Sequence, residues 1–143
     1  MRRIGPYPNK LETGPGFHCC RGRNERNYMP VIKYKEVEHK KIEGEGIAHV
    51  TKAVPIGKNV GWDGHTMRIF RIAPGGHTPR HQHDWEHVNY IISGKGKLSL
   101  DGKEYEVNEK DFAFVPPNTL HQFQNPYDKD FEFICIVPDK GEY

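Results

Sequence analysis

The sequence predicts an all-β protein, organised as an antiparallel barrel or jelly roll. Three observations lead to this fold class. Short runs rich in Val, Ile, Thr, Phe and Tyr recur between turn residues, and no segment shows extended helical periodicity. Asp101 and Gly102 form a two-residue hairpin signal between two such runs. At 143 residues, the chain fits one domain with a core of useful size.

We expect an irregular N-terminal arm over residues 1–30 and the barrel over residues 31–143. The arm is rich in Pro and Gly and has neither helical nor strand periodicity. It carries six Lys or Arg against two acids, whereas the remainder carries 15 against 17. Scattered basic residues of this kind are typical of a solvated tail, so we expect no nucleic-acid partner. As an alternative, Met29 is the native start and the preceding residues are a translated leader.

Composition also bears on where the protein works. No apolar stretch approaches a membrane span, and no apolar segment follows the basic residues at the N-terminus, so we expect neither a membrane partner nor a signal peptide. Three cysteines are too few for a disulfide framework, which favours a reducing, cytoplasmic setting. His18, Cys19 and Cys20 have no matching ligand pair nearby, so we interpret them as unrelated residues of the arm.

From residue 31 onward, short β-type runs recur at the spacing of a sandwich or barrel. Pro, Gly, Asn and Asp separate the runs, as expected of turns. Both faces of the last run are largely apolar, so that strand is either central or covered by a partner subunit, and we expect a homodimer. The expected strands are residues 31–37, 47–54, 66–72, 78–83, 88–92, 97–100, 103–107, 112–115, 120–124 and 131–137.

Four histidines carry the main functional signal. His81, His83 and His87 lie within seven residues, and His121 follows in a separate run. Alternate residues on a strand share a face, so the side chains of His81 and His83 are expected to converge. Neutral imidazole is a common ligand of transition metals, so the spacing indicates a metal site. The alternative is four surface or hydrogen-bonded histidines without an ion.

The spacing around these histidines resembles the first motif of small single-domain cupins. In that motif a glycine is followed, after five residues, by His-x-His, then by a glutamate and a second glycine. Gly75, His81, His83 and Gly94 fit the frame, and His87 stands where the glutamate is usual. The neighbouring Glu86 is expected to point away from His87, as a supporting or surface residue.

A second segment resembles the second cupin motif. Pro116, His121 and Asn125 fit its frame, whereas Lys110 and Asn118 replace its two glycines. Asn tolerates the left-handed turn that a glycine would serve, so the second replacement is mild. The resemblance covers about residues 66–137, with both motifs in order.

The resemblance to cupins implies a single jelly-roll barrel with a divalent metal held by His81, His83, His87 and His121. It is similar to the subgroup whose metal has four histidines and no glutamate. Four neutral imidazoles leave the charge of the ion uncompensated, so we expect an anionic substrate or ligand. Two positions of a six-coordinate ion stay open, which is a catalytic geometry. We expect one iron, manganese, zinc, nickel or copper ion per chain.

Several neighbours are candidate pocket residues. His77 lies an even number of residues from His81, and Phe123 from His121, so each is expected on the same strand face as that histidine. Phe133 and Cys135 share an inward face. Together they would give a partly apolar cavity beside the metal. The alternatives are an exposed rim position for His77 and a small core residue for Cys135.

Three arginines are candidates for holding an anionic substrate. Arg68, Arg71 and Arg80 alternate with apolar residues, however, and this pattern predicts that they face outward. Trp85 lies in the turn of the histidine motif and is either a lid for the pocket or a packing anchor at a subunit contact.

We consider three functions for such a site. The first is a metal-dependent, dioxygenase-like oxidoreductase acting on a small organic anion or enol, with the ion binding substrate oxygens and dioxygen. The second is a non-redox lyase or isomerase that stabilises an enediolate of a sugar or keto acid. The third is a binding module that captures a small ligand without catalysis. The fold alone does not choose among them.

Overall fold

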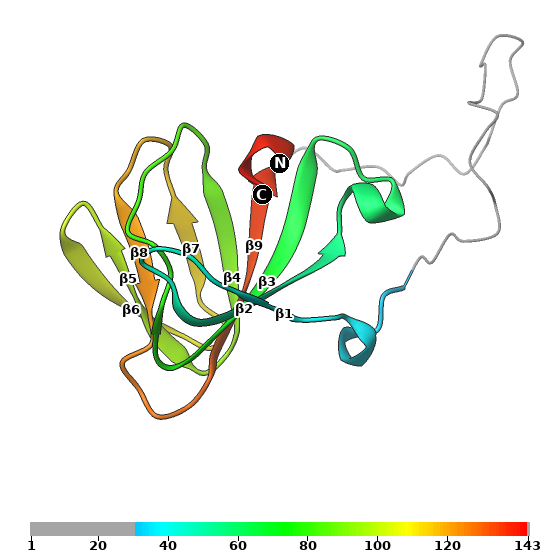
Figure 1. Ribbon diagram of the computed structural model, residues 1–143. Helices are drawn as coiled ribbons and strands as arrows, with labels where there is room; N and C mark the ends of the chain where they lie inside the picture. The colour runs from blue at the N-terminus through cyan, green and yellow to red at the C-terminus, as the bar shows by residue number, and fades with distance from the viewer. Residues whose placement is uncertain (1–30, 143) are drawn as a thin grey trace, which may run out of the picture.

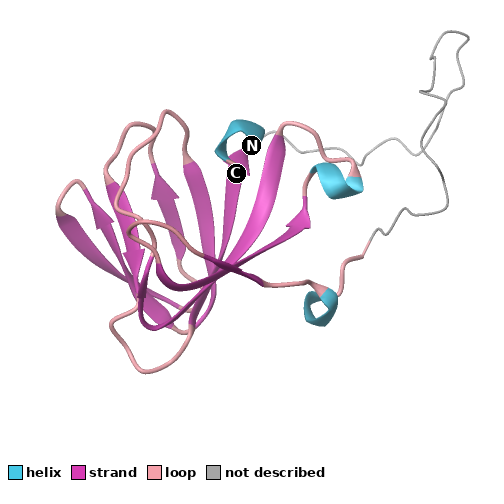
Figure 2. Cartoon of the chain, in the orientation of Figure 1, coloured by secondary structure: helices cyan, strands magenta, loops and turns pink. Residues whose placement is uncertain are grey.

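The computed structural model describes residues 31–142, and these form a nine-stranded antiparallel sheet that curls into a nearly closed barrel (Figures 1 and 2). The all-β jelly-roll prediction is confirmed. The interpretations placed on residues 1–30, including Met29, His18, Cys19 and Cys20, lie outside the described residues. No helix in the described part of the chain is both long and apolar enough to cross a membrane.

Strands make up most of the barrel, and short 3-10 helices lie beside them (Figure 2). The 3-10 helices are η2 (Tyr34–Glu36), η3 (Lys58–Val60) and η4 (Asp139–Gly141). The strands are β1 (Lys40–Ile42), β2 (Ala48–Ile56), β3 (His65–His77), β4 (His87–Ser93), β5 (Lys95–Leu100), β6 (Lys103–Asn108), β7 (Phe112–Val115), β8 (His121–Gln124) and β9 (Phe131–Pro138).

Strand β9 lies at the centre of the sheet, between β3 and β4. Its inward residues Phe131, Phe133, Cys135 and Val137 are each at most 1% exposed and form the core with residues of the facing strands. Of the two explanations for the apolar faces of this strand, a central position is therefore correct. Two of its inward residues, Phe133 and Cys135, also line the cavity inside the barrel.

Eight of the expected strands correspond to β2 through β9, but two expectations are wrong. Residues 31–37 form no strand and instead contain η2, whose residues are all exposed. The neighbouring β1 is the strand that sequence reasoning missed, because two of its three residues are exposed lysines without an apolar alternation.

Residues 78–83 are the second wrong expectation, because they form a loop instead of a strand. Pro79 has no N–H to donate to a ladder, so continuous pairing with β8 stops after Thr78. Thr78 donates its N–H to the carbonyl of Phe123, and only His81 pairs again, as an isolated bridge to His121.

The positions of the motif glycines are tight left-handed turns. Gly94 has φ 71°, and a Cβ built there would lie 2.1 Å from the carbonyl oxygen of Asp130. Asn118 has φ 58°, so the left-handed turn expected there is confirmed. Lys110, at the other replaced glycine, also has a positive φ, of 72°, which costs free energy for a side chain with a Cβ.

Strand β1 and the turn after it run across the front of the barrel in the view of Figure 1. Strand β1 pairs with β2, with Lys41 opposite Thr51. Lys41, Ile42 and Ile47 line the main cavity from this crossing segment. Strand β1 and the turn after it therefore form part of the wall of the chamber inside the barrel.

Candidate metal centre

Two of the four motif histidines are joined through their backbones. The N–H of His81 lies 3.1 Å from the carbonyl oxygen of His121, and the N–H of His121 lies 2.9 Å from the carbonyl oxygen of His81. Residues that exchange both hydrogen bonds in an antiparallel pair direct their side chains to the same face. The bridge therefore brings the two imidazoles together, with ring centroids 4.8 Å apart.

Two imidazoles are oriented by backbone carbonyls. Nδ1 of His83 donates to the carbonyl oxygen of Trp85 at 2.8 Å, and Nδ1 of His121 donates to the carbonyl oxygen of Thr119 at 2.8 Å. A carbonyl can only accept, so Nδ1 carries the proton and Nε2 keeps its lone pair. Both Nε2 atoms are buried and have no hydrogen-bond partner. A buried nitrogen lone pair without a donor is the arrangement expected of a metal ligand.

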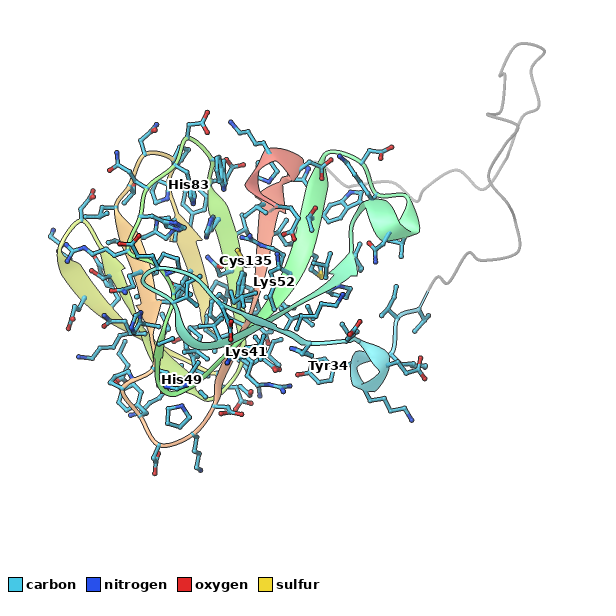
Figure 3. The ribbon with its side chains drawn as sticks, in the orientation of Figure 1. Tyr34, Lys41, His49, Lys52, His83 and Cys135 are labelled. Atoms are coloured by element: carbon cyan, nitrogen blue, oxygen red, sulfur yellow. The ribbon has the colours of Figure 1, made fainter. Side chains whose placement is uncertain are left out.

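The ring nitrogens of His81, His83 and His121 converge. Their ligand atoms all lie within 4.8 Å of one another, and His83 lies in the loop between β3 and β4 (Figure 3). Three neutral nitrogen donors at this separation fit a divalent transition metal such as zinc, iron or copper. No carboxylate of the described residues belongs to this group.

His87 stands beside this triad without belonging to it. The side chain is buried at the start of β4, with its ring 4.7 Å from that of His83 and 4.9 Å from that of His121. Its Nδ1 is buried without a partner. His87 is therefore near enough to bind the same ion. The close grouping of ligand atoms is formed by His81, His83 and His121.

Burial keeps these imidazoles neutral. Desolvation, with the positive charges of neighbouring groups, lowers the pKa of His81 to about 4 and that of His87 to about 2, from an ordinary value of 6.5. Desolvation also lowers the pKa of His83 and His121. Metal binding requires the neutral ring, so at neutral pH the cluster is already in the protonation state that an ion needs.

The cluster opens into a cavity of about 350 Å³ inside the barrel. Its walls are largely apolar and include Phe70, Phe123 and Phe133, with Phe123 and Phe133 stacked at 4.3 Å between centroids. Cys135 also lines the cavity, and burial raises the pKa of its thiol. Lys52 of β2 lines the cavity as well, whereas His83, in the loop between β3 and β4, is not among its lining residues (Figure 3). A chamber of this size suits a small organic ligand.

A family model for the cupin domain matches residues 68–137, the segment that contains all four histidines. The chain belongs to the cupin family.

The cupin barrel of this chain is similar to several known proteins. The polyketide cyclase RemF from Streptomyces resistomycificus has a structure with TM-score 0.72 and 27% identity, over 77% of this chain and 79% of that one. The 1-methylthio-D-xylulose 5-phosphate methylsulfurylase of Rhodospirillum rubrum is 31% identical over 71 residues, which are 50% of this chain and 46% of that protein.

A further relative is the (S)-ureidoglycine aminohydrolase of Escherichia coli, with 32% identity over 104 residues. The match covers 67% of this chain and 40% of that enzyme. This chain thus spans less than half the length of these two curated relatives, so their activities do not transfer with the domain.

The cupin chamber also holds a residue whose position sequence reasoning got wrong. Arg68 was expected to face outward, yet it is 3% exposed and lines the cavity. Arg71 faces the other side of β3, where its Nε donates to Glu132 at 2.8 Å, and Arg80 is exposed. Positions 68 and 71 differ by three, so on one strand they must lie on opposite faces, and this signal was present in the sequence.

Other predicted neighbours divide between the chamber and its surroundings. Phe123, Phe133 and Cys135 line the cavity, whereas His77 does not. His77 lies at the end of β3, and its Nδ1 donates to the carbonyl oxygen of Gly46 at 2.9 Å. It therefore ties the crossing segment to β3 instead of facing the chamber.

Trp85 is half-buried and packs beside His83 in the loop between β3 and β4. Its indole stacks on His83, and Gly141 of η4 also lies against the indole, close to Nε1. Glu86, half-buried just before β4, is not among the residues that line the chamber.

Proposed function

We propose that this cupin is a metal-dependent enzyme that promotes a non-redox rearrangement or cleavage of a small, enolisable organic anion. The observation that carries the proposal is the convergence of the ligand atoms of His81, His83 and His121 at the wall of a small apolar chamber. We assign these three residues as metal ligands and His87 as the fourth. A divalent ion held there would polarise a substrate carbonyl or enol oxygen as a Lewis acid.

The remaining residues act on the substrate by enclosure and charge. The aromatic walls exclude water, which strengthens every electrostatic interaction inside the chamber. Neutral imidazoles contribute no negative charge, so an anionic substrate meets no repulsion from the ligands. The names of two relatives support a reaction without dioxygen, since cyclisation and hydrolysis do not consume it.

A dioxygenase-like oxidoreductase is the second candidate. Nitrogen donors without a carboxylate accommodate iron or copper as well as zinc, and both of these metals react with dioxygen. The substrate would be the same class of small anion or enol, so the two candidates share the chamber and differ in the metal and in the use of oxygen.

Hydrogen–deuterium exchange separates the candidates. Zinc-loaded protein is incubated without oxygen in D₂O with pyruvate or phenylpyruvate, and loss of the proton next to the carbonyl is followed by NMR. We expect exchange above the protein-free blank, and its reduction by about 100-fold in His121→Ala, whose metal content is measured in parallel. Oxygen uptake by iron-loaded protein, with no exchange by the zinc form, would select the second candidate. Absence of both activities in metal-loaded protein would reject enzymatic action on these anions.

We further propose that the protein is a homodimer joined through the outer face of β4 and β7. Phe112 is 81% exposed, Phe114 57% and Val88 47%, and β7 ends the hydrogen-bonded strand order. Val88 lies opposite Phe114 in the β4–β7 pairing, so these side chains adjoin on one face. Large exposed apolar surfaces are typical of contacts between proteins.

Light scattering tests the homodimer. It should give a dimer for the native chain and a monomer for the variant with Phe112→Glu and Phe114→Glu; a native monomer contradicts the proposal.

A further inference from the structure

Arg68 brings a buried positive charge into the chamber. It lies on β3 with 3% of its surface exposed, and its guanidinium sits 5.0 Å from the centroid of the Phe70 ring. An arginine stays protonated at any pH of interest, so it cannot escape burial by losing its charge. A buried charge is costly unless it is paired and hydrogen-bonded.

The partners of this guanidinium compensate it only in part. Nη1 donates to the carbonyl oxygen of Gly141 at 3.1 Å, and Nη2 donates to Sγ of Cys135 at 3.1 Å. Both acceptors are neutral: the peptide carbonyl carries no charge, and burial raises the pKa of the Cys135 thiol, which favours its protonated form. The nearest carboxylate oxygen is Oε2 of Glu142, 3.7 Å from Nη1, and Glu142 is shared with Lys52, whose Nζ lies 2.6 Å from Oε1.

One donor of Arg68 has no partner at all. Nε is buried and makes no hydrogen bond with the described residues. Buried donors are paired in nearly all proteins, so an unpaired N–H on a residue that lines the cavity points to a ligand that completes its hydrogen bonding. The flat guanidinium presents its N–H groups as a fork that matches two oxygens of one anion.

The chamber favours a carboxylate as that anion. A phosphate ester carries nearly two negative charges and several strong acceptor oxygens, which call for more donors than one partly occupied guanidinium offers. A carboxylate has one charge and two oxygens. Beside Arg68, the stacked pair Phe70 and Phe133, 5.6 Å between centroids, forms a flat apolar wall that suits a planar or unsaturated body.

We propose that Arg68 is the substrate-recognition residue of this cupin and binds, through its fork, the carboxylate of a small substrate with a flat apolar body. This inference rests on the proposed function in one respect, because it takes the metal chamber to be the substrate site. It adds the substrate class, a carboxylic acid, and the residue that selects it.

Binding of benzoate tests the proposal without requiring turnover. Zinc-loaded full-length protein is titrated calorimetrically with benzoate, with its neutral analogue benzamide, and with inorganic phosphate. The native protein should bind benzoate at least about tenfold more tightly than benzamide, as expected for a hydrogen-bonded charge pair. Arg68→Met should lose this preference. Arg71→Met removes an arginine from the opposite face of the same strand and should keep it.

Two further variants keep the test decisive. Arg68→Lys retains a buried cation if the Met variant does not fold, and it should lose most of the preference because lysine lacks the fork. His121→Ala impairs the metal centre and should retain the preference for benzoate over benzamide. A preference that vanishes in His121→Ala but persists in Arg68→Met would overturn the proposal, since the metal would then recognise the carboxylate. Full preference in Arg68→Lys, or tighter binding of phosphate than of benzoate, would also overturn it.

The outcome stays separate from that of the proposed function. Benzoate has no exchangeable proton next to a carbonyl, so its binding reports on carboxylate recognition without turnover. Arg68-dependent benzoate binding without deuterium exchange of keto acids would reject the enzymatic proposal and leave the carboxylate site in place. Deuterium exchange of keto acids without a preference for benzoate over benzamide would support the enzymatic proposal and reject the carboxylate site at Arg68.

Discussion

The imidazole of His83 and the indole of Trp85 stack face to face, with centroids 4.0 Å apart and an interplanar angle of 1°. The same tryptophan supplies the carbonyl oxygen to which Nδ1 of His83 donates. One residue therefore fixes both the plane and the tautomer of a proposed metal ligand. Gly141 of η4 also packs against Trp85, so η4 supports the loop between β3 and β4 that carries His83.

Trp85→Leu should weaken metal binding while leaving the barrel folded. The leucine keeps the backbone carbonyl but loses the stacked surface, so His83 is no longer held in one plane. Loss of such support typically costs about 10-fold to 100-fold in metal affinity. Competition with a zinc chelator measures the affinity, and Trp62→Leu is the matched control because Trp62 stacks on His65, away from the cluster. Equal zinc affinity in native protein and Trp85→Leu would show that the stacking has no role in binding.

Gly141→Ala should destabilise the fold. A Cβ built at this position would lie 2.5 Å from Nε1 of Trp85, too close for either group to stay in place. Overpacking of this kind typically costs about 1–3 kcal/mol in free energy of unfolding. Urea unfolding measures the change. Lys140→Ala serves as control, since it removes exposed contacts without overpacking, namely an ion pair with Asp84 and a cation–π contact with Trp85 at 5.7 Å, which contribute little to stability. A Gly141→Ala loss no larger than that of Lys140→Ala would contradict the steric explanation.

Lys110→Gly should stabilise the fold. Lys110 is exposed and holds a left-handed φ of 72°, while its N–H donates to the carbonyl oxygen of Ile91, a bond that glycine retains. Relief of the left-handed conformation is worth about 1 kcal/mol, less the flexibility that glycine adds to the unfolded chain. Asn118→Gly should change stability less, because asparagine tolerates this region. Thermal unfolding compares the two, and a lower midpoint in Lys110→Gly would refute the prediction.

The metal-free protein should lose stability as the pH falls from about 7 to about 5. The folded-state pKa values of His81 and His87, about 4 and about 2, lie below the unfolded value of 6.5. The unfolded chain therefore binds more protons in this window, and the free energy of unfolding rises with pH. The stabilisation is fully present above pH 6.5 and is lost as the pH falls toward the folded values.

Urea unfolding of chelator-treated protein across this window measures the slope. In a variant with His81→Gln and His87→Gln, the slope should become shallower because glutamine does not titrate, while His83 and His121, whose pKa is also lowered, keep part of it. The carboxylates whose pKa is lowered, such as Asp84 and Asp139, titrate below this range and do not mask the effect. An unchanged slope in the double variant would assign the pH dependence to other groups.

Much of the fold could be predicted because its signals are local. Strand alternation, the hairpin turn at Asp101 and Gly102, and the left-handed residue at Asn118 each depend on a few neighbouring residues. The expected strand over residues 78–83 was wrong for an equally local reason, since Pro79 interrupts the ladder. His81 nevertheless reaches the cluster, because the isolated bridge to His121 replaces the expected strand pairing.

The histidine spacing in the sequence indicated His81, His83 and His121 as neighbours, because metal ligands must be of a suitable type and recur in a recognisable frame, and these three converge in the structure. The role of His87 as a fourth ligand stays a prediction. The tertiary structure alone decided which face of β3 points inward, and therefore that Arg68 and not Arg71 enters the chamber. It also decided that η4 packs against Trp85 and that β1 lines the chamber. These relationships join residues far apart in the chain, and alternation along one strand carries no information about which partner will cover each face.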